Sequence, residues 1–283
     1  MGLVDRDDGW RVPDWLWELF VPLLPAAPSH PLGCHRPRVP DRDAMDAILL
    51  VLRTGMQWNA LNGSGICSSS AAHRRFQEWE RAGVFHEIWR QGLLDYDRVV
   101  GIDWAWLAAD GAMGKAPLGG EKTGPNPTDR AKKGAKRSVL CEAAGVPIGL
   151  AHDGANRHDS KLLEATLDSI PIERPKPTKR RPQGLCLDRA FDYPVVRDLV
   201  TARKFTPHIR SRGEEIQLKL RTPGWRARRW VVEACHSWLN RNRALLIRWS
   251  KKDENHLALL QLGSALIAFK KAHAARLALA QTG

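Results

Sequence analysis

The order of the apolar runs along the chain constrains its fold more than any other feature. Through residue 95 the apolar side chains recur at helical spacing, in the segments 14–24, 41–53, 71–81 and 84–94. From residue 104 onward, short apolar runs bounded by turns replace this pattern. Two of them, 138–143 and 147–151, are joined around Gly145 and predict a hairpin. Further strands are predicted at 104–109, 183–187 and 205–209, and helices at 159–170, 193–203, 226–248 and 255–275. Strands that first pair in a hairpin and then alternate with helices predict an α/β fold with a mixed sheet.

Local signals set the expected boundaries. We expect Asp41 and Asp159 to be helix N-caps, and Gly55 to end the helix that begins at Asp41. Two segments, 111–134 and 171–182, are rich in proline and basic residues and are expected to be irregular. The predicted organisation is therefore an N-terminal helical region at 1–95, an α/β domain at 96–275 and a tail at 276–283.

The N-terminal region contains a candidate helix-turn-helix. Two predicted helices, 41–53 and 71–81, are joined by a glycine-containing connection, and the second carries His73, Arg74 and Arg75. These three side chains would contact DNA. The connection is longer than the tight turn of the motif, so a helical subdomain that only packs on the rest of the protein is an equal alternative.

The charge of the chain favours a polyanionic partner. Lysine and arginine number 44 against 31 acidic residues, for a net charge of +13, and cations that contact phosphates release condensed counterions. The segment 115–137 has seven basic and two acidic residues, and the segment 203–252 has fourteen basic and three acidic ones. The basic residues predicted to contact DNA in these segments are Lys115, Arg130, Lys132, Lys133, Arg226, Arg229 and Arg241.

Other classes of protein are disfavoured. The first thirty residues lack the basic and apolar regions of a signal peptide, and no apolar run is long enough to cross a membrane. The five cysteines are an odd number without Cys-x-x-Cys spacing, which favours a reduced, cytoplasmic compartment and disfavours structural zinc.

Three acidic residues are the candidates for chemistry. Asp110 and Asp188 each directly follow an apolar predicted strand, and reactive groups in α/β sheets lie beyond strand ends. Either aspartate alone would fit a turn or a helix N-cap equally well. Glu233 lies in a predicted helix, on a stripe that also carries Arg226, Arg229 and His236. His236 would orient the glutamate or a phosphate, and a solvated side chain without such a role is the alternative.

The combination of acids and surrounding bases suits phosphoryl transfer on DNA. Two magnesium ions about 3.5–4 Å apart stabilise both the attacking and the leaving oxygen of such a reaction. Hard cations prefer oxygen ligands, which carboxylates supply. Surrounding arginines would hold the phosphates. A glycosidase also uses paired carboxylates, but the strong positive charge makes that class remote.

The sequence resembles insertion-sequence-five-type bacterial transposases, within the insertion-sequence-four superfamily. The resemblance covers roughly residues 14 to 270, with the matching blocks in the family's order. The blocks are Val51-Leu-Arg-Thr-Gly55, Ser70-Ala-Ala-His-Arg-Arg-Phe-Gln-Glu-Trp79, Asp110-Gly-Ala-Met-Gly-Lys-Ala-Pro-Leu-Gly-Gly120, Gly124-Pro-Asn-Pro-Thr-Asp-Arg130, Gly154-Ala-Asn-Arg-His-Asp159, Leu185-Cys-Leu-Asp188 and Trp230-Val-Val-Glu233.

This resemblance implies an RNase H-like catalytic domain whose metal-binding DDE triad is Asp110, Asp188 and Glu233. It also implies a divalent metal, Mg²⁺ or Mn²⁺ in two ions, and double-stranded DNA partners in the form of terminal inverted repeats and target. The transposase would cleave the backbone and join 3′-hydroxyl ends as a homo-oligomer on DNA. The sequence departs from the family pattern at several positions: Arg226 stands at a usual tyrosine, Arg189-Ala-Phe191 replaces Lys-Gly-Tyr, and Ala234 and Asn240 each replace a usual basic residue. The alternative is therefore an inactive, transposase-derived DNA-binding repressor, and a structure-specific nuclease is a third candidate.

Overall fold

The computed structural model describes residues 9–26, 37–209, 217, 220–221 and 230–282. The first part of this chain is helical, as predicted. Its elements are α1 (Asp14–Phe20), η1 (Val21–Leu23), α2 (Asp41–Thr54), η2 (Trp58–Gly63), α3 (Ser69–Arg81) and α4 (Val84–Val99).

Local chemistry explains where these helices begin and end. Helix α2 ends at Gly55, whose φ of 68° is in the left-handed region that glycine adopts without strain. Helix α3 begins after Ser68, whose side chain accepts a hydrogen bond from the backbone nitrogen of Ala71 at 3.3 Å. The prediction that Asp41 caps α2 is wrong. Pro40 occupies that position, and the Asp41 carboxylate pairs with Arg75 of α3 instead.

The second part contains a six-stranded mixed sheet. Its strands are β1 (Trp106–Lys115), β2 (Gly124–Pro125), β3 (Lys133–Cys141), β4 (Pro147–Gly154), β5 (Gly184–Leu187) and β6 (Thr206–Ile209). β1 pairs antiparallel with β3, and β3 pairs antiparallel with β4. On the other side of β1, β5 and β6 continue the sheet in the parallel direction. Three antiparallel strands extended by two parallel ones, in the order β4-β3-β1-β5-β6, are the arrangement of an RNase H-like core.

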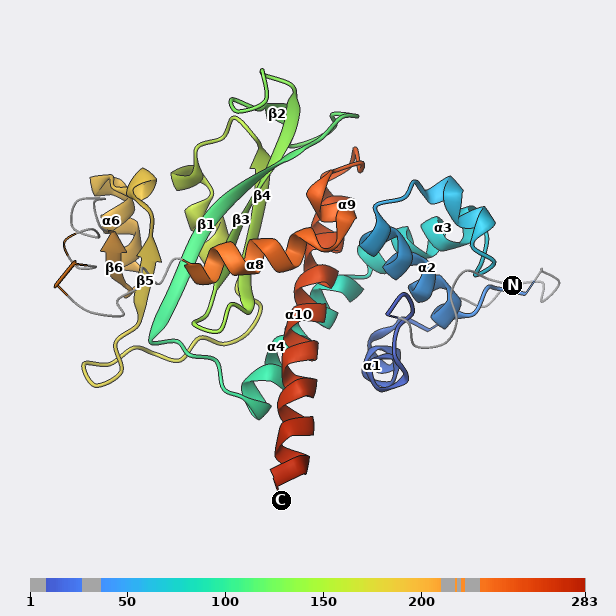
Figure 1. Ribbon diagram of the computed structural model, residues 1–283, viewed down its shortest axis with the longest axis horizontal. Coiled ribbons are helices and arrows are strands. Elements are labelled where there is room, and N and C mark those ends of the chain that lie inside the picture. Colours follow the sequence, from blue (N-terminus) through green and yellow to red (C-terminus); the bar gives the residue numbers. More distant parts are fainter. Residues whose placement is uncertain (1–8, 27–36, 210–216, 218–219, 222–229, 283) are drawn as a thin grey trace.

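Helices cover both faces of the sheet. The remaining elements are η3 (Asp159–Lys161), α5 (Leu163–Asp168), η4 (Arg189–Phe191), α6 (Pro194–Ala202), α8 (Trp230–Asn240), α9 (Arg243–Leu246) and α10 (Asp253–Thr282). α8 crosses one face over β1 and β3 (Figure 1), and α5 packs against β3 and β4 on the other. Thr166 of α5 and Ser138 of β3 share a buried hydrogen bond of 2.8 Å on that second face.

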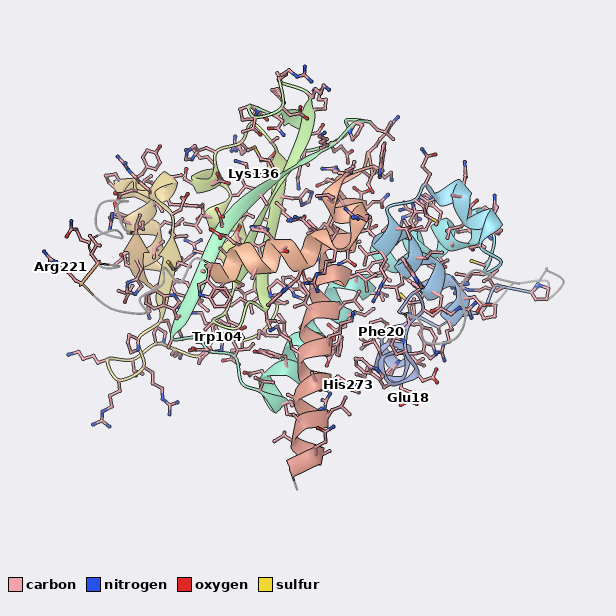
Figure 2. All side chains as sticks on the ribbon, in the orientation of Figure 1. Glu18, Phe20, Trp104, Lys136, Arg221 and His273 are labelled. Atoms are coloured by element: carbon pink, nitrogen blue, oxygen red, sulfur yellow. The ribbon has the colours of Figure 1, made fainter. Side chains whose placement is uncertain are left out.

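The long helix α10 connects the two parts. It packs along α4, and Figure 1 shows this pair between the sheet and helices α1 to α3. Trp15 of α1 stacks on His273 of α10 with ring centroids 4.0 Å apart, and Phe20 meets Phe269; Figure 2 labels Phe20 and His273 side by side. One apolar core consequently runs from Val12 through the sheet to Ala272.

The structure differs from the expected boundaries in three places. β1 extends to Lys115, so Asp110 lies within the strand and not at its end. The predicted helix 226–248 is interrupted after Asn240, and a short helix, α9, follows. The expected borders at residues 95 and 276 lie inside the continuous helices α4 and α10. Within the described residues, no helix is both long and apolar enough to span a membrane.

Candidate active site

Asp110 and Asp188 lie at the same level of two adjacent parallel strands. Ala108 of β1 is paired with Cys186 of β5, and the two strands advance in step. Asp110 lies two residues after Ala108, and Asp188 lies two residues after Cys186. Neighbouring strands are about 4.8 Å apart, so the two aspartates flank the point where β5 ends and β1 continues.

Each aspartate has one carboxylate oxygen fixed by the backbone. Oδ1 of Asp110 accepts from the nitrogen of Gly111 at 2.8 Å, and Oδ1 of Asp188 accepts from the nitrogen of Ala190 at 2.8 Å. The second bond makes Asp188 the N-cap of η4. The structural role considered for Asp188 therefore coexists with its place beside Asp110. No residue that the structure describes bonds to the other oxygen of either carboxylate, which leaves that oxygen available to a ligand.

Glu233 approaches this point from α8. The helix buries Val232, Cys235 and Leu239 against the sheet and leaves Glu233 exposed. Among the residues that the structure describes, the Glu233 carboxylate has no hydrogen-bond or ion-pair partner.

The electrostatics of Asp110 indicate that the acids are close together. Burial, the main cause, and the neighbouring carboxylates of Asp188, Asp159 and Glu233 raise the pKa of Asp110 to about 6, although the bond from Gly111 opposes them. The structure thus brings together all three acids predicted from the sequence. It adds a fourth, Asp159, which was predicted to be an N-cap. That prediction is wrong, because His158 caps η3.

The donor set suits divalent metal ions. Within the described chain, none of Asp110, Asp188 and Glu233 forms an ion pair with a lysine or arginine, in a protein of net charge +13. The ligand oxygens of these three residues do not all lie within 4.8 Å of one another. Carboxylates without cationic partners repel one another, and a hard cation bound by their oxygens would relieve that repulsion.

A second acidic group, Glu121, Asp253 and Glu254, does have its ligand oxygens within 4.8 Å of one another. Its charge is already engaged by protein groups. Asp253 pairs with Lys122 at 2.6 Å, and the hydrogen bond from Lys122 is the main reason that the pKa of Asp253 falls to about 2. We assign this group to the junction between the β1–β2 loop and the start of α10.

Arg137 was missed as a site residue, since the sequence shows only one more basic residue in a lysine-rich segment. It is buried under α8 and donates to Nδ1 of His236 at 3.2 Å, to the carbonyl of His236 at 3.2 Å and to Oδ1 of Asn240 at 2.7 Å. A fourth bond, at 3.0 Å, reaches the carbonyl of Leu245 in α9. Arg137 therefore anchors the helix that carries Glu233, and Asn240 is one of its acceptors.

His236 belongs to this anchor. Its ring is buried, and burial together with the Arg137 charge lowers its pKa to about 3, so the ring is neutral. Because Arg137 donates to Nδ1, the proton of the neutral ring is on Nε2, which has no hydrogen-bond partner among the described residues. His236 thus links α8 to β3 through Arg137, and its buried ring does not reach the surface where DNA would lie.

The other residues predicted to bind DNA differ in how far their side chains are exposed to solvent. Arg75 is buried between Asp41, Glu78 and the carbonyl of Val39, and it cannot reach a phosphate without breaking these contacts. His73 is half-buried, with its ring 4.9 Å from that of Trp58. Arg226 and Arg229 lie outside the described residues. The exposed members are Arg74, Lys115, Arg130, Lys132, Lys133 and Arg241.

Comparisons with known proteins agree with this geometry. Residues 107–268 match a sequence-family model described as "Transposase DDE domain", and residues 12–89 match one described as "Putative transposase of IS4/5 family". The "Putative transposase for insertion sequence element IS402" of Burkholderia cepacia is 37% identical over 151 residues, which are 53% of this chain and 69% of that protein. A second protein of that organism, "Insertion element IS402 uncharacterized 16.2 kDa protein", is 35% identical over 121 residues, covering 41% and 80% of the two chains.

Among solved structures, the catalytic domain of Mos1 mariner transposase aligns with a TM-score of 0.28 and 10% identity, covering 66% of this chain and 91% of that one. Similarity at that level does not bear on the assignment. The first family model covers more than half of the chain, and the three carboxylates fall within it. The chain belongs to the DDE transposases of the IS4/5 family.

Proposed function

We propose that this transposase binds the terminal inverted repeats of a mobile element, cleaves the phosphodiester backbone at their ends and joins the 3′-hydroxyl ends to target DNA. The observation that carries the proposal is the gathering of Asp110, Asp188 and Glu233 where β5 ends. The charges of Asp188 and Glu233 both raise the pKa of Asp110, and no described lysine or arginine forms an ion pair with any of the three.

DDE transposase domains use divalent metal ions. We propose two Mg²⁺ or Mn²⁺ ions, held by Asp110, Asp188 and Glu233. When bound, such a pair stabilises the attacking and leaving oxygens of an in-line displacement. The backbone bonds to Asp110 and Asp188 fix one oxygen of each carboxylate, which aims the other. Arg137 of β3 holds α8, and with it Glu233, against the sheet through His236 and Asn240.

Two phosphoryl transfers make up the proposed reaction. In the first, a water oxygen bonds to phosphorus, the bond from phosphorus to the 3′-oxygen breaks, and a 3′-hydroxyl and a 5′-phosphate remain. In the second, that 3′-hydroxyl oxygen bonds to a target phosphorus and the target's own 3′-oxygen leaves with a proton. One bond forms and one breaks in each step, and neither step requires an oxidant or a reductant.

The exposed basic residues named above would contact the DNA backbone. Lys115 ends β1, Arg130 and Lys132 lie in the loop before β3, and Lys133 is the first residue of β3, so all four lie near the far end of the strand that carries Asp110. Phosphate contacts of this kind position the duplex and make binding dependent on salt. We further propose that the protein acts as a homo-oligomer on paired ends, which the mass of the DNA complex in light scattering would test.

The test is Asp188→Asn, compared with Asp192→Asn as a matched control. Asp192 is an exposed aspartate at the other end of η4 that pairs with Arg197 at 2.8 Å. We expect Asp188→Asn to bind repeat DNA in a gel shift yet lose magnesium-dependent strand transfer, while Asp192→Asn retains both. Transfer that continues undiminished in Asp188→Asn would refute the triad assignment.

The same assay separates the alternatives. Binding of the repeats by the wild-type protein without any nicking in Mg²⁺ or Mn²⁺ would indicate a repressor. Cleavage that never produces joined products would indicate a nuclease. Both results would overturn the proposal of a complete transposition reaction.

A further inference from the structure

A fourth carboxylate lies on the opposite side of β1 from α8. Asp159 is the first residue of η3, which follows β4 and packs against η4, the short helix that Asp188 caps. The ring of His158 meets that of Tyr193, just beyond η4, at 5.7 Å. The segment around Asp159 therefore contacts the segment that positions Asp188.

Asp159 also contacts β1 directly beside Asp110. A Cβ atom added to Gly111 would overlap with Oδ1 of Asp159, so the carboxylate occupies the space that a side chain at position 111 would fill. This contact explains why glycine follows Asp110. Oδ1 is buried against the strand and has no hydrogen-bond donor in the described structure.

Lys136 of β3 holds the other oxygen of this carboxylate. Its ammonium group lies 3.1 Å from Oδ2 of Asp159, and its side chain is only 8% exposed, against 24% for Asp159. Figure 2 labels Lys136 in the middle of the sheet. A lysine buried to this extent keeps its partner in one place, because separating the pair would leave a charge without compensation.

Asp159 lies beside the catalytic centre. Its carboxylate lies against Gly111, the residue that directly follows Asp110 in β1. Lys136 also lies beside Gly111, so the Asp159 carboxylate compensates a cation that would otherwise repel metal ions at the neighbouring ligands.

We propose that Asp159 is a positioning residue of the catalytic centre. It would strengthen divalent-cation binding at Asp110 and Asp188 by its charge and by its contact with Gly111, while Lys136 holds it in place. This inference rests on the proposed metal site and extends it by one residue. Partners that orient metal ligands commonly change metal affinity about 10- to 100-fold when they are altered.

The first test measures Mn²⁺ affinity by electron paramagnetic resonance of free Mn²⁺, independently of DNA cleavage. We expect Asp159→Asn to weaken binding about tenfold. The substitution keeps the shape of the side chain and an oxygen for Lys136. Asp153→Asn is the matched control, because Asp153 lies at the end of β4 facing Arg157 at 3.6 Å, and it should leave the affinity unchanged. Unchanged affinity in Asp159→Asn, with its unfolding midpoint intact, would overturn the inference.

A double-mutant cycle provides the second test. Gly111→Ala should displace the Asp159 carboxylate and weaken Mn²⁺ binding by a similar factor. If it acts through Asp159, Gly111→Ala combined with Asp159→Ala should be no weaker than Asp159→Ala alone. Fully additive losses would contradict the inference, because they would mean that Gly111→Ala disturbs Asp110 directly.

The proposed function and this inference fail in different ways. If Asp110→Asn and Asp188→Asn leave Mn²⁺ affinity unchanged, the proposed metal site itself is wrong. If those two variants lose affinity and Asp159→Asn does not, the metal site stands and only the role of Asp159 is refuted.

Discussion

Replacing Arg137 with methionine tests how the helix that carries Glu233 is held. Methionine has a similar length and no hydrogen-bond donors, so the four acceptors of the guanidinium group would each lose a bond. Two of these acceptors are backbone carbonyls, of His236 and Leu245, and a third is Nδ1 of the buried His236 ring.

The size of the effect follows from burial. A buried acceptor left without a donor costs about 1–3 kcal/mol. Asn240 is only partly buried and can bond to water instead. Removing the guanidinium group also removes its own desolvation, the cause that lowers the pKa of Arg137 to about 10. We therefore expect a net loss of about 3 kcal/mol in the free energy of unfolding, a large share of the roughly 5–15 kcal/mol typical of a folded domain.

Urea denaturation followed by circular dichroism measures this loss as a lower midpoint. Arg74→Met is the matched control, because Arg74 is exposed on α3 and its loss should change the stability by about 0.5 kcal/mol or less. Arg137→Lys should recover part of the loss, since lysine supplies one donor group in place of the planar fork. If Arg137→Met unfolds within about 1 kcal/mol of the wild-type protein, Arg137 does not anchor α8 in the way described.

Three further predictions concern pH and DNA. Burial lowers the pKa of His152 to about 4, and also lowers that of His256, so both rings are neutral in the folded protein. In the unfolded protein a histidine takes up a proton below about pH 6.5, whereas these buried rings do so only at lower pH. The free energy of unfolding is therefore unaffected by the two histidines above pH 6.5 and decreases as the pH falls toward 4. At pH 5.5 the loss from His152 is about 1–2 kcal/mol, and a His152→Gln variant whose melting temperature falls as steeply with pH would contradict it. Lys132→Ala and Lys133→Ala should each weaken repeat binding and reduce the slope of log affinity against log salt by about 1; an unchanged slope would remove that lysine from the interface. Arg75→Ala should leave the salt slope unchanged and lower the unfolding midpoint, because its partners are protein groups; a reduced slope would instead mean that Arg75 contacts DNA.

Most strands of the sheet could be predicted from the sequence, because they depend on short-range patterns, whereas β2 lies in a segment that was expected to be irregular. The hairpin of β3 and β4, and the placement of Asp188 after a four-residue apolar strand, are both read from neighbouring residues. Asp110 was predicted to end its strand, since glycine follows it. The strand continues because residues 110–115 pair with 134–139 of β3, a contact that no local pattern reports.

Long-range contacts also explain the interrupted C-terminal helix. Periodicity predicted one helix from 226 to 248, but the chain leaves α9 after Leu246 and runs beside the end of β1. There Ile247 forms a bridge with Lys115, and the nitrogen of Arg248 donates to the carbonyl of Lys115 at 2.8 Å. The gain from these contacts exceeds the local preference for helix, which amounts to only tenths of a kcal/mol per residue.

The sequence shows how many basic residues the chain has, but not which of them are buried and which are exposed. Arg75, Lys136 and Arg137 are all buried, and each is committed to protein partners. Nothing in the sequence distinguishes them from Arg74 or Lys133, which are exposed. Burial depends on which residues face each other across the tertiary structure, and that information is absent from a single helix or strand.

The burial of some basic residues and the exposure of others bear on catalysis. A site that must bind cations in a strongly basic protein would fail if nearby lysines and arginines neutralised its carboxylates. Among the described residues, two buried cations of β3 are engaged with protein partners, Lys136 with Asp159 and Arg137 with α8 and α9. Neither forms an ion pair with the three carboxylates, and the exposed cations would remain available to the DNA backbone. Attraction of DNA and binding of metal ions, which require opposite charges, would thereby be separated within the same domain.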